Sequence, residues 1–172
     1  KRFVVVATNE VGPGGAIKDT SRTSLQGLAL VGGSLYVSDF HNNRVLVVTA
    51  ATGEKSGEIT LDKPGPLAAC GSDLVAVSGT SIVRGALPKG NVTPFLAAGG
   101  VEPRGLTVDA QGKVYVSDAK THTGVVLDAN GKETARLGTP GGPYAGPYAA
   151  PRMVNPNALA VASNGWLWVC EE

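Results

Sequence analysis

The sequence has few charged residues, few aromatic residues and only two histidines. Charged residues make up 17% of the 172 residues and aromatic residues 5%, and the net charge is +1. The charge forms no basic cluster, which argues against nucleic acid as the main partner. The apolar runs fall far short of the ~20 residues that a membrane-spanning helix needs. A 3.6-residue apolar period does not persist for more than a turn or two, so we expect almost no helix.

The sequence also lacks the common motifs of cofactor and active sites. It has no glycine-rich phosphate loop, no serine nucleophile elbow, and no paired carboxylates or Cys–His arrangement at a useful spacing. Cys70 and Cys170 fall at different strand positions of different repeats, and we interpret them as two buried thiols rather than a disulfide. No zinc-ligand spacing surrounds either cysteine. The sequence therefore predicts no cofactor and no catalytic residue.

Short apolar runs separated by turns dominate the chain, which holds 24 glycines and 11 prolines. Residues 104–132 contain three such runs, at 106–108, 114–116 and 125–127. Gly112 lies in the turn between the first two runs, and Asn130-Gly131 forms another turn after the third. Strand-length runs rich in Val and Leu with turn residues between them indicate an up-and-down antiparallel meander.

This pattern repeats along the chain. The leucines that open the successive units are Leu28, Leu67, Leu106 and Leu159, at steps of 39, 39 and 53 residues. The residues that we align within the second strand of each unit are Tyr36, Ala76, Tyr115 and Trp168. A repeated four-stranded unit of about 40 residues is typical of a β-propeller blade. The longer last step indicates a loop insertion at residues 138–156.

The units also resemble a known repeat. An NHL repeat is similar to residues 106–118, LTVDAQGKVYVSD, and to the THT and LDANGK that follow. The first unit has the same pattern, with LYVSD at 35–39 and NNRV at 42–45. In the second unit we align Gly79 with the Asp of this pattern, and in the fourth Glu171 takes its place. The resemblance covers residues 26–172. It implies a propeller of five or six blades, in a family that includes lyases and hydrolases but consists mostly of binding scaffolds.

The sequence therefore predicts an all-β chain, an incomplete portion of a β-propeller with four-stranded antiparallel blades. Residues 1–24 would supply a strand of a preceding blade and a connection. Residues 25–63, 64–102 and 103–140 would each form a blade, and 141–172 the insertion loop and half of another. We expect the chain to be an excerpt of a longer protein. Pairing of residues 1–7 with the last strand, or association of several copies through open blade edges, remains an alternative.

Several residues that could carry chemistry have simpler structural interpretations. Asp39 and Asp118 recur at the end of the second strand, where an aspartate caps the following turn. His41 and His122 lie in equivalent loops two blades apart, and no third ligand accompanies them, so we predict no metal site. Trp166 and Trp168 alternate along one strand, and we expect them to pack between blades.

One rim of the propeller gathers the candidate binding residues. The second-to-third strand loops and the blade connections should share this rim, and we expect Arg104 there to contact an anionic ligand or an acidic partner. The insertion adds two tyrosines in a repeated Gly-Pro-Tyr-Ala segment. The candidate residues are Gln26, His41, Asn42, Asn43, Arg44, Arg104, His122, Tyr144, Tyr148, Arg152 and Asn157.

These features favour a non-enzymatic scaffold that binds a protein or a carbohydrate through its loop-rich rim. Two alternatives stay open: a lyase or hydrolase with a metal in the central channel, and a structural repeat that self-assembles. Low charge and abundant Gly, Pro and Thr suit a secreted, periplasmic or cell-surface bacterial protein.

Overall fold

The computed structural model describes residues 25–86, 91–96, 99–143, 145–147, 149 and 151–172. The predicted strand at residues 1–7 and the predicted binding residues Tyr144 and Tyr148 lie outside the described residues. Within the described part, the one helical element is the single 3-10 turn η1 (Phe40–Asn42), and no helix there is long and apolar enough to span a membrane. The expectation of almost no helix is confirmed for these residues.

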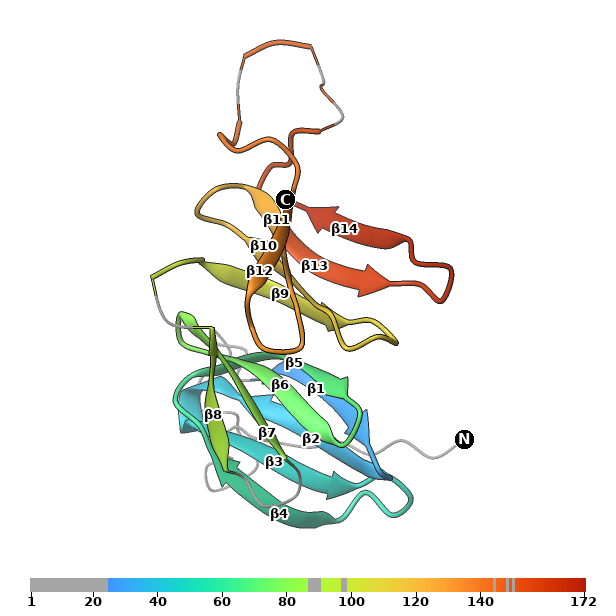
Figure 1. Ribbon diagram of the computed structural model, residues 1–172. Coiled ribbons are helices and arrows are strands. Elements are labelled where there is room, and N and C mark those ends of the chain that lie inside the picture. The colour runs from blue at the N-terminus through green and yellow to red at the C-terminus, as the bar shows by residue number, and fades with distance from the viewer. Residues whose placement is uncertain (1–24, 87–90, 97–98, 144, 148, 150) are drawn as a thin grey trace.

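Strands adjacent in sequence pair with one another in antiparallel sheets (Figure 1). The first sheet contains β1 (Leu25–Val31), β2 (Ser34–Asp39), β3 (Arg44–Thr49) and β4 (Lys55–Thr60). The second contains β5 (Pro64–Cys70), β6 (Asp73–Ser78), β7 (Ser81–Ala86) and β8 (Val92–Leu96). The third contains β9 (Pro103–Val108), β10 (Val114–Asp118), β11 (Thr123–Leu127) and β12 (Glu133–Leu137). A two-stranded sheet of β13 (Pro156–Val161) and β14 (Leu167–Glu171) follows.

The hairpin turns follow from aspartate and glycine at fixed positions. In the β9–β10 turn, the Asp109 Oδ1 atom accepts hydrogen bonds from the backbone N–H of Gln111 and Lys113, both at 2.9 Å. Gly112 adopts φ 81°, a conformation that a residue with a Cβ rarely takes. The turn at residues 128–132 repeats this construction. Short turns of this kind hold consecutive strands in register.

The sheets stack face to face as propeller blades, and each buried core is shared by two neighbours. We call the three four-stranded sheets the first, second and third blades and β13–β14 the half-blade. The core between the first and second blades contains Ala29, Tyr36, Val45, Val47, Ile59, Leu67, Leu74 and Ala76. The core between the second and third blades contains Cys70, Val75, Val77, Ile82, Leu106, Val114, Val116, Val125 and Leu127. The predicted all-β fold with four-stranded antiparallel blades is confirmed.

The outer strands of the second and third blades are also connected. Arg84 forms an ion pair with Asp73 (Nε–Oδ2, 2.9 Å) and donates a hydrogen bond to the carbonyl oxygen of Ala129 (3.1 Å). Its guanidinium carbon lies 5.8 Å from the centre of the Phe95 ring. A Cβ at Gly131 would overlap the Phe95 carbonyl, so the third blade's turn lies directly on β8. This contact fixes the spacing of the two blades at their outer edge.

Strand register corrects two alignments in the second unit. Leu67 pairs with Ala76 as Leu28 pairs with Val37, so Val75, not Ala76, occupies the position of Tyr36. Likewise Pro64 pairs with Ser78 as Leu25 pairs with Asp39, which puts Ser78, not Gly79, at the aspartate position. A shift of one residue matters because it moves a side chain to the opposite face of the sheet.

The half-blade leaves one face open. Trp166 and Trp168 are 66% and 61% exposed, with ring centroids 6.2 Å apart. At the equivalent position Tyr36 is only 2% exposed because the second blade covers it. The rings of the two tryptophans contact each other, and none of the described blades covers them, so their packing between blades stays a prediction. Cys170, two residues along the same strand, is exposed, so the expectation of two buried thiols is right only for Cys70.

Candidate functional site

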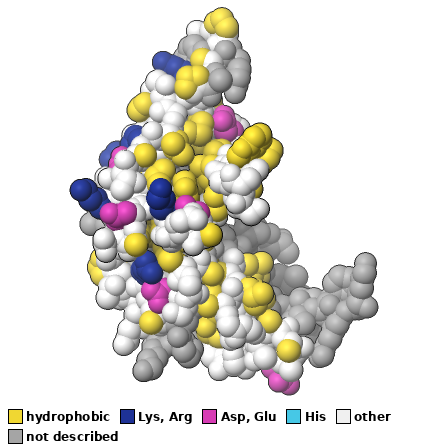
Figure 2. Space-filling model, turned by 45° about the vertical axis from the view of Figure 1, so that its right-hand side comes forward, with side chains coloured by type: hydrophobic (Ala, Val, Ile, Leu, Met, Phe, Trp, Pro, Cys, Tyr) yellow, Lys and Arg dark blue, Asp and Glu magenta, His cyan; other side chains and the backbone are white. Residues whose placement is uncertain are grey.

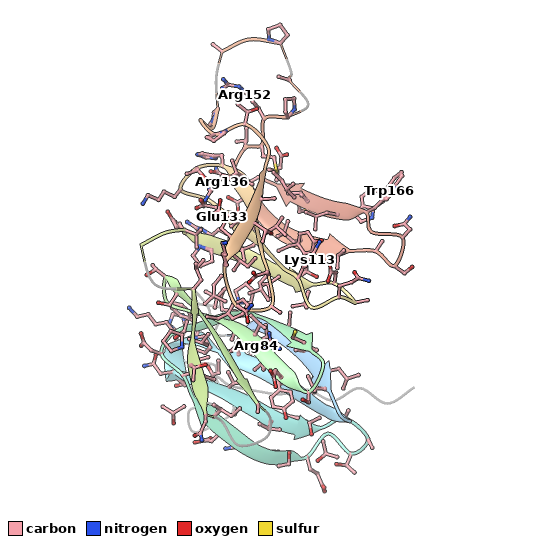
Figure 3. All side chains as sticks on the ribbon, in the orientation of Figure 1. Arg84, Lys113, Glu133, Arg136, Arg152 and Trp166 are labelled. Carbon is pink, nitrogen blue, oxygen red and sulfur yellow. The ribbon has the colours of Figure 1, made fainter. Side chains whose placement is uncertain are left out.

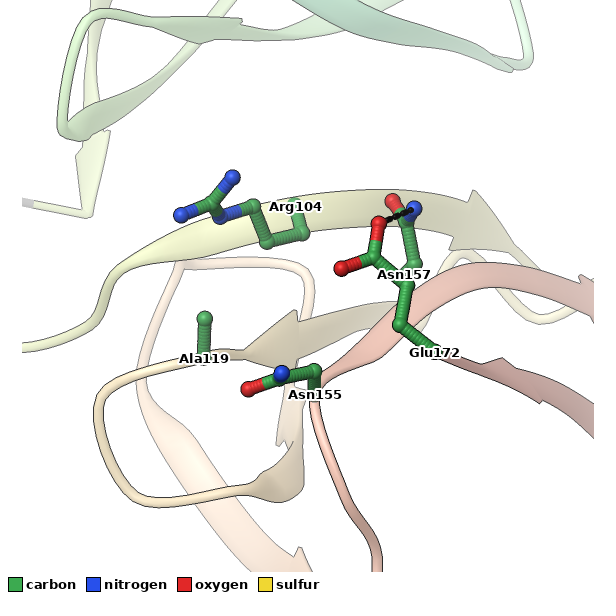
Figure 4. Close-up of a pocket in the computed structure, with 5 residues that line it drawn as sticks. All are labelled: Arg104, Ala119, Asn155, Asn157 and Glu172. Carbon is green, nitrogen blue, oxygen red and sulfur yellow. Dashed lines mark hydrogen bonds between the residues drawn. The ribbon is translucent and has the colours of Figure 1, made fainter. Parts of the chain in front are cut away.

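A polar pocket of about 100 Å³ lies between the third blade and the half-blade (Figure 4). Its lining residues are Arg104, Ala119, Asn155, Asn157 and Glu172. Arg104 and Asn157 each lie two residues before the aligned leucine of their unit, and Ala119 and Glu172 each follow the last residue of the second strand. The pocket is therefore formed by the same positions of two consecutive repeats.

A short hydrogen-bond chain fixes the two inner strands beside this pocket. The Gly105 backbone N–H donates to the Ser117 Oγ atom (2.6 Å), and the Ser117 hydroxyl donates to the carbonyl oxygen of Asn157 (2.8 Å). Gly105 lacks a Cβ, and a Cβ there would overlap the Asn157 carbonyl oxygen. Glycine at this position is what allows β9 and β13 to approach so closely.

The charged groups of the pocket are not equally compensated. The Arg104 Nη2 atom lies 2.7 Å from the Glu102 Oε1 atom, so an acidic neighbour offsets its charge. The Glu172 Oε1 atom accepts a hydrogen bond from the Asn157 side chain (3.1 Å), which is a neutral donor. The ion pair with Glu102 weakens the case for Arg104 as a receptor for anions. Glu102 and Arg104 are two residues apart, so strand periodicity placed them on one face and was the signal that could have predicted their contact.

The insertion packs against the β10–β11 loop at this rim. The His122 Nδ1 atom accepts a hydrogen bond from the Asn155 backbone N–H (3.0 Å). A neutral imidazole that accepts at Nδ1 carries its proton on Nε2, so the second nitrogen is a donor and not a base. Thr121 also accepts a hydrogen bond from the Gly141 backbone N–H (3.3 Å). His122 thus holds the end of the insertion next to the pocket.

Asp118 has the structural role that we predicted for it. Its Oδ1 atom accepts hydrogen bonds from the backbone N–H of Glu102 (2.9 Å) and Lys120 (3.0 Å), and its Oδ2 atom accepts from Thr121 (2.6 Å) and Arg136 (3.0 Å). Burial raises the pKa of this carboxyl, but these hydrogen bonds outweigh burial and hold the pKa below its ordinary value of 3.8.

Asp39 lies at the corresponding position of the first blade, but its side chain does not cap the following 3-10 turn, so the predicted capping role is confirmed for Asp118 only. Asp39 is fully buried and binds the side chains of Asn42 and Arg44, each at 2.9 Å. Arg44 also contacts Glu58 (3.4 Å), and the Asn43 side chain accepts a hydrogen bond from the Lys63 backbone (2.9 Å). These contacts connect the β2–β3 loop of the first blade to its outer strand and to the start of the second blade.

Of the predicted binding residues, the structure brings Arg104 and Asn157 together in the pocket, with His122 one contact away through Asn155. Gln26, His41, Asn43 and Arg44 belong to the first blade, and Arg152 to the insertion. Sequence patterns did not indicate Asn155 or Glu172 as lining residues. Among the described residues no group of three or more His, Cys, Asp or Glu side chains could hold a metal ion.

No protein-family model and no curated protein matches the sequence. Several solved structures match the fold of this chain. Virginiamycin B lyase from Staphylococcus aureus is 19% identical with a TM-score of 0.64, over 94% of this chain and 55% of that one. A chain of a nidogen–laminin complex is 17% identical with a TM-score of 0.66, over 86% and 56%. Hydrazine synthase from Kuenenia stuttgartiensis is 16% identical with a TM-score of 0.65, over 88% and 43%.

The chain thus spans about half the length of the solved structures that it matches. At these identities the likeness concerns the fold alone. Together with the stacked four-stranded sheets, it establishes that the chain has the β-propeller fold.

Proposed function

We propose that the chain is a non-enzymatic, NHL-type β-propeller scaffold that binds a protein or a carbohydrate through its loop-rich rim. The observation that carries this proposal is the polar pocket at the rim, where the blade connection, the insertion and the repeat positions of Arg104 and Asn157 meet. Exposed amide and charged groups at a concave seam are suited to hydrogen bonding with a partner's surface.

The remaining rim residues extend this proposed surface around the ring. They are Gln26, His41, Asn43, Arg44, His122 and Arg152, together with Tyr144 and Tyr148 of the insertion. Tyrosine provides a flat, amphipathic contact area, and such residues carry much of the energy at binding surfaces. An exported bacterial setting fits this proposal, because the composition has low charge and abundant Gly, Pro and Thr.

A selection experiment with a matched control tests the proposal. A random peptide display library and a glycan array are probed with the wild-type protein, and the ligands found are measured against Asn157→Ala/Tyr144→Ala/Tyr148→Ala. We expect the triple variant to bind about a hundredfold more weakly or worse, since truncating such contacts costs roughly 1 kcal/mol or more each. Lys113→Ala, in the β9–β10 turn at the other end of the blade, is the control and should bind normally.

Two results would contradict the proposal. One is a ligand whose affinity is unchanged in the triple variant. The other is a triple variant that unfolds at a lower temperature than wild type, which would make these residues structural.

The second candidate function is a lyase or hydrolase that uses a metal in the channel. It is favoured by the presence of streptogramin B and virginiamycin B lyases among the structural neighbours. Metal analysis of the purified protein separates the two candidates. Stoichiometric zinc, calcium or iron would support the enzyme, and a metal-free preparation that retains its ligand would support the scaffold.

A further inference from the structure

We propose that the rim pocket binds the ammonium group of a lysine side chain from a protein partner. This inference rests on the proposed binding function and adds the chemistry of the group that is bound. It differs from the expectation based on the sequence, in which Arg104 contacts an anion.

The balance of charge in the pocket favours a cation. Arg104 is paired with Glu102 at 2.7 Å, whereas the described partner of the Glu172 carboxylate is the neutral amide of Asn157. The uncompensated charge is therefore that of Glu172. A carboxylate ligand would be repelled by Glu102 and Glu172 while it competed with Glu102 for Arg104. An ammonium group gains the attraction of Glu172 with only one opposing cation in the lining.

The neutral lining supplies further acceptors. The side-chain carbonyls of Asn155 and Asn157 can accept hydrogen bonds, and none of the described residues bonds to the Asn155 side-chain amide. An ammonium group has three donors, which matches one carboxylate and two amide oxygens. Figure 4 shows Arg104 extending from β9. Asn157 lies in β13, Asn155 directly before it, and Glu172 directly after β14.

The pocket is large enough to admit the end of a lysine side chain. Its volume is about 100 Å³. The terminal methylene and ammonium of lysine occupy a space of this order, and the Ala119 methyl can contact the methylenes. Lysine side chains commonly place their stem on apolar atoms and their charge in a polar site.

A titration of the whole chain, followed by NMR of the backbone amides of Ala119, Asn155 and Asn157, tests the proposal. The probes are Nα-acetyl-lysine amide, its neutral analogue Nα-acetyl-glutamine amide, the anionic Nα-acetyl-glutamate amide, and n-butylamine. We expect the lysine probe to shift these amides, with an affinity that falls as salt is added. Glu172→Gln should weaken it roughly tenfold, and Arg104→Gln should tighten it about threefold because Glu102 becomes unpaired.

Each contrary result has a defined meaning. Preferred binding of the glutamate probe, or weaker lysine binding in Arg104→Gln, would overturn the cation site. n-Butylamine carries the same ammonium group and stem and should shift the same amides, so a lysine probe that shifts them while n-butylamine does not would overturn the ammonium as the bound group. If the lysine probe leaves the pocket amides unshifted while the display-selected ligand still depends on the rim residues, this inference fails and the proposed scaffold function stands. Thermal melting of every variant confirms that it is folded.

Discussion

At the scale of single residues, the fully buried Asp118 at the end of β10 binds three other segments of the third blade. It binds the backbone of the incoming connection at Glu102, the β10–β11 loop at Lys120 and Thr121, and Arg136 on β12. Arg136 in turn lies 3.0 Å from Glu133, its neighbour on the outer strand (Figure 3). One carboxylate thereby fixes the loop that borders the pocket.

Asp118→Asn should lower the free energy of unfolding by about 2 kcal/mol at pH 7, because Arg136 loses its buried charged acceptor. The pKa of Asp118 in the folded chain lies below 3.8, its ordinary value, so the ionised group stabilises the fold above about that pH. This contribution disappears as the pH falls through the folded-state pKa. Urea unfolding at several pH values should show the difference between wild type and variant shrinking below about pH 3.8.

The control for this prediction is Glu54→Gln, which neutralises an exposed carboxylate. It should leave the midpoint of urea unfolding nearly unchanged at every pH. A difference between wild type and Asp118→Asn that stays constant down to pH 2 would contradict the role assigned to the ionised carboxylate.

At the scale of strands, the close approach of β9 and β13 depends on one glycine. Gly105→Ala should destabilise the chain by about 3 kcal/mol, since the new methyl overlaps the backbone carbonyl of Asn157 and the half-blade must shift. Gly100→Ala is the matched control, because a Cβ at Gly100 meets no atom within 4 Å. Thermal melting of both variants provides the measurement. Equal melting temperatures for the two would show that β13 does not lie where the structure places it.

Sequence patterns predicted the strands well and their alignment less well. Turn residues and short apolar runs locate these strands because β10 and β11 are buried along most of their length, and because β9 and β11 are each followed by a turn that begins with Asp and contains Gly. The second blade was aligned one residue out of register, because its Gly71 hairpin is one residue shorter than the β9–β10 hairpin and its second strand lacks the Ser-Asp ending. The pairings of Leu67 with Ala76 and of Pro64 with Ser78 reveal the shift.

The candidate site was less predictable than the strands for a physical reason. Repeat positions placed Arg104 and Asn157 on one rim, and the structure brings them into one pocket. The charge of that pocket depends on contacts between segments, namely Glu102 with Arg104 and Glu172 with Asn157. Side-chain pairing of this kind leaves little periodic pattern in a sequence. The proposed preference for a cationic ligand therefore depends on the geometry of the pocket.

At the scale of the whole molecule, hydrophobic side chains remain exposed at both ends of the stack. Leu28 and Leu30 on β1 are 63% and 61% exposed, and Trp166 and Trp168 cover the outer face of the half-blade. The space-filling view shows hydrophobic side chains exposed on both the upper and lower parts of the molecule (Figure 2), and Trp166 projects from the hairpin (Figure 3). Apolar patches of this kind are sites for association.

Tryptophan fluorescence measures this face directly, because Trp166 and Trp168 are the two tryptophans of the chain. We expect acrylamide to quench the folded protein at low concentration almost as effectively as the urea-unfolded chain. If copies associate through this face, quenching should fall as the protein concentration rises, and Trp166→Lys, which keeps Trp168 as the fluorescent reporter, should weaken that dependence. Strong protection at the lowest concentration would contradict the exposed position of the two rings.

The division of the core into two separate clusters has a consequence for how the chain unfolds. Each cluster is shared by adjacent blades, so stability propagates along a line of neighbours instead of radiating from one centre. The second blade is covered on both faces and contributes to both core clusters. The half-blade is held on one face only, so its local unfolding requires less free energy. Amide exchange should therefore be graded along the stack, slowest in β6 and β7 and fastest in β14, and the rim pocket lies at the end of that gradient where the structure opens first.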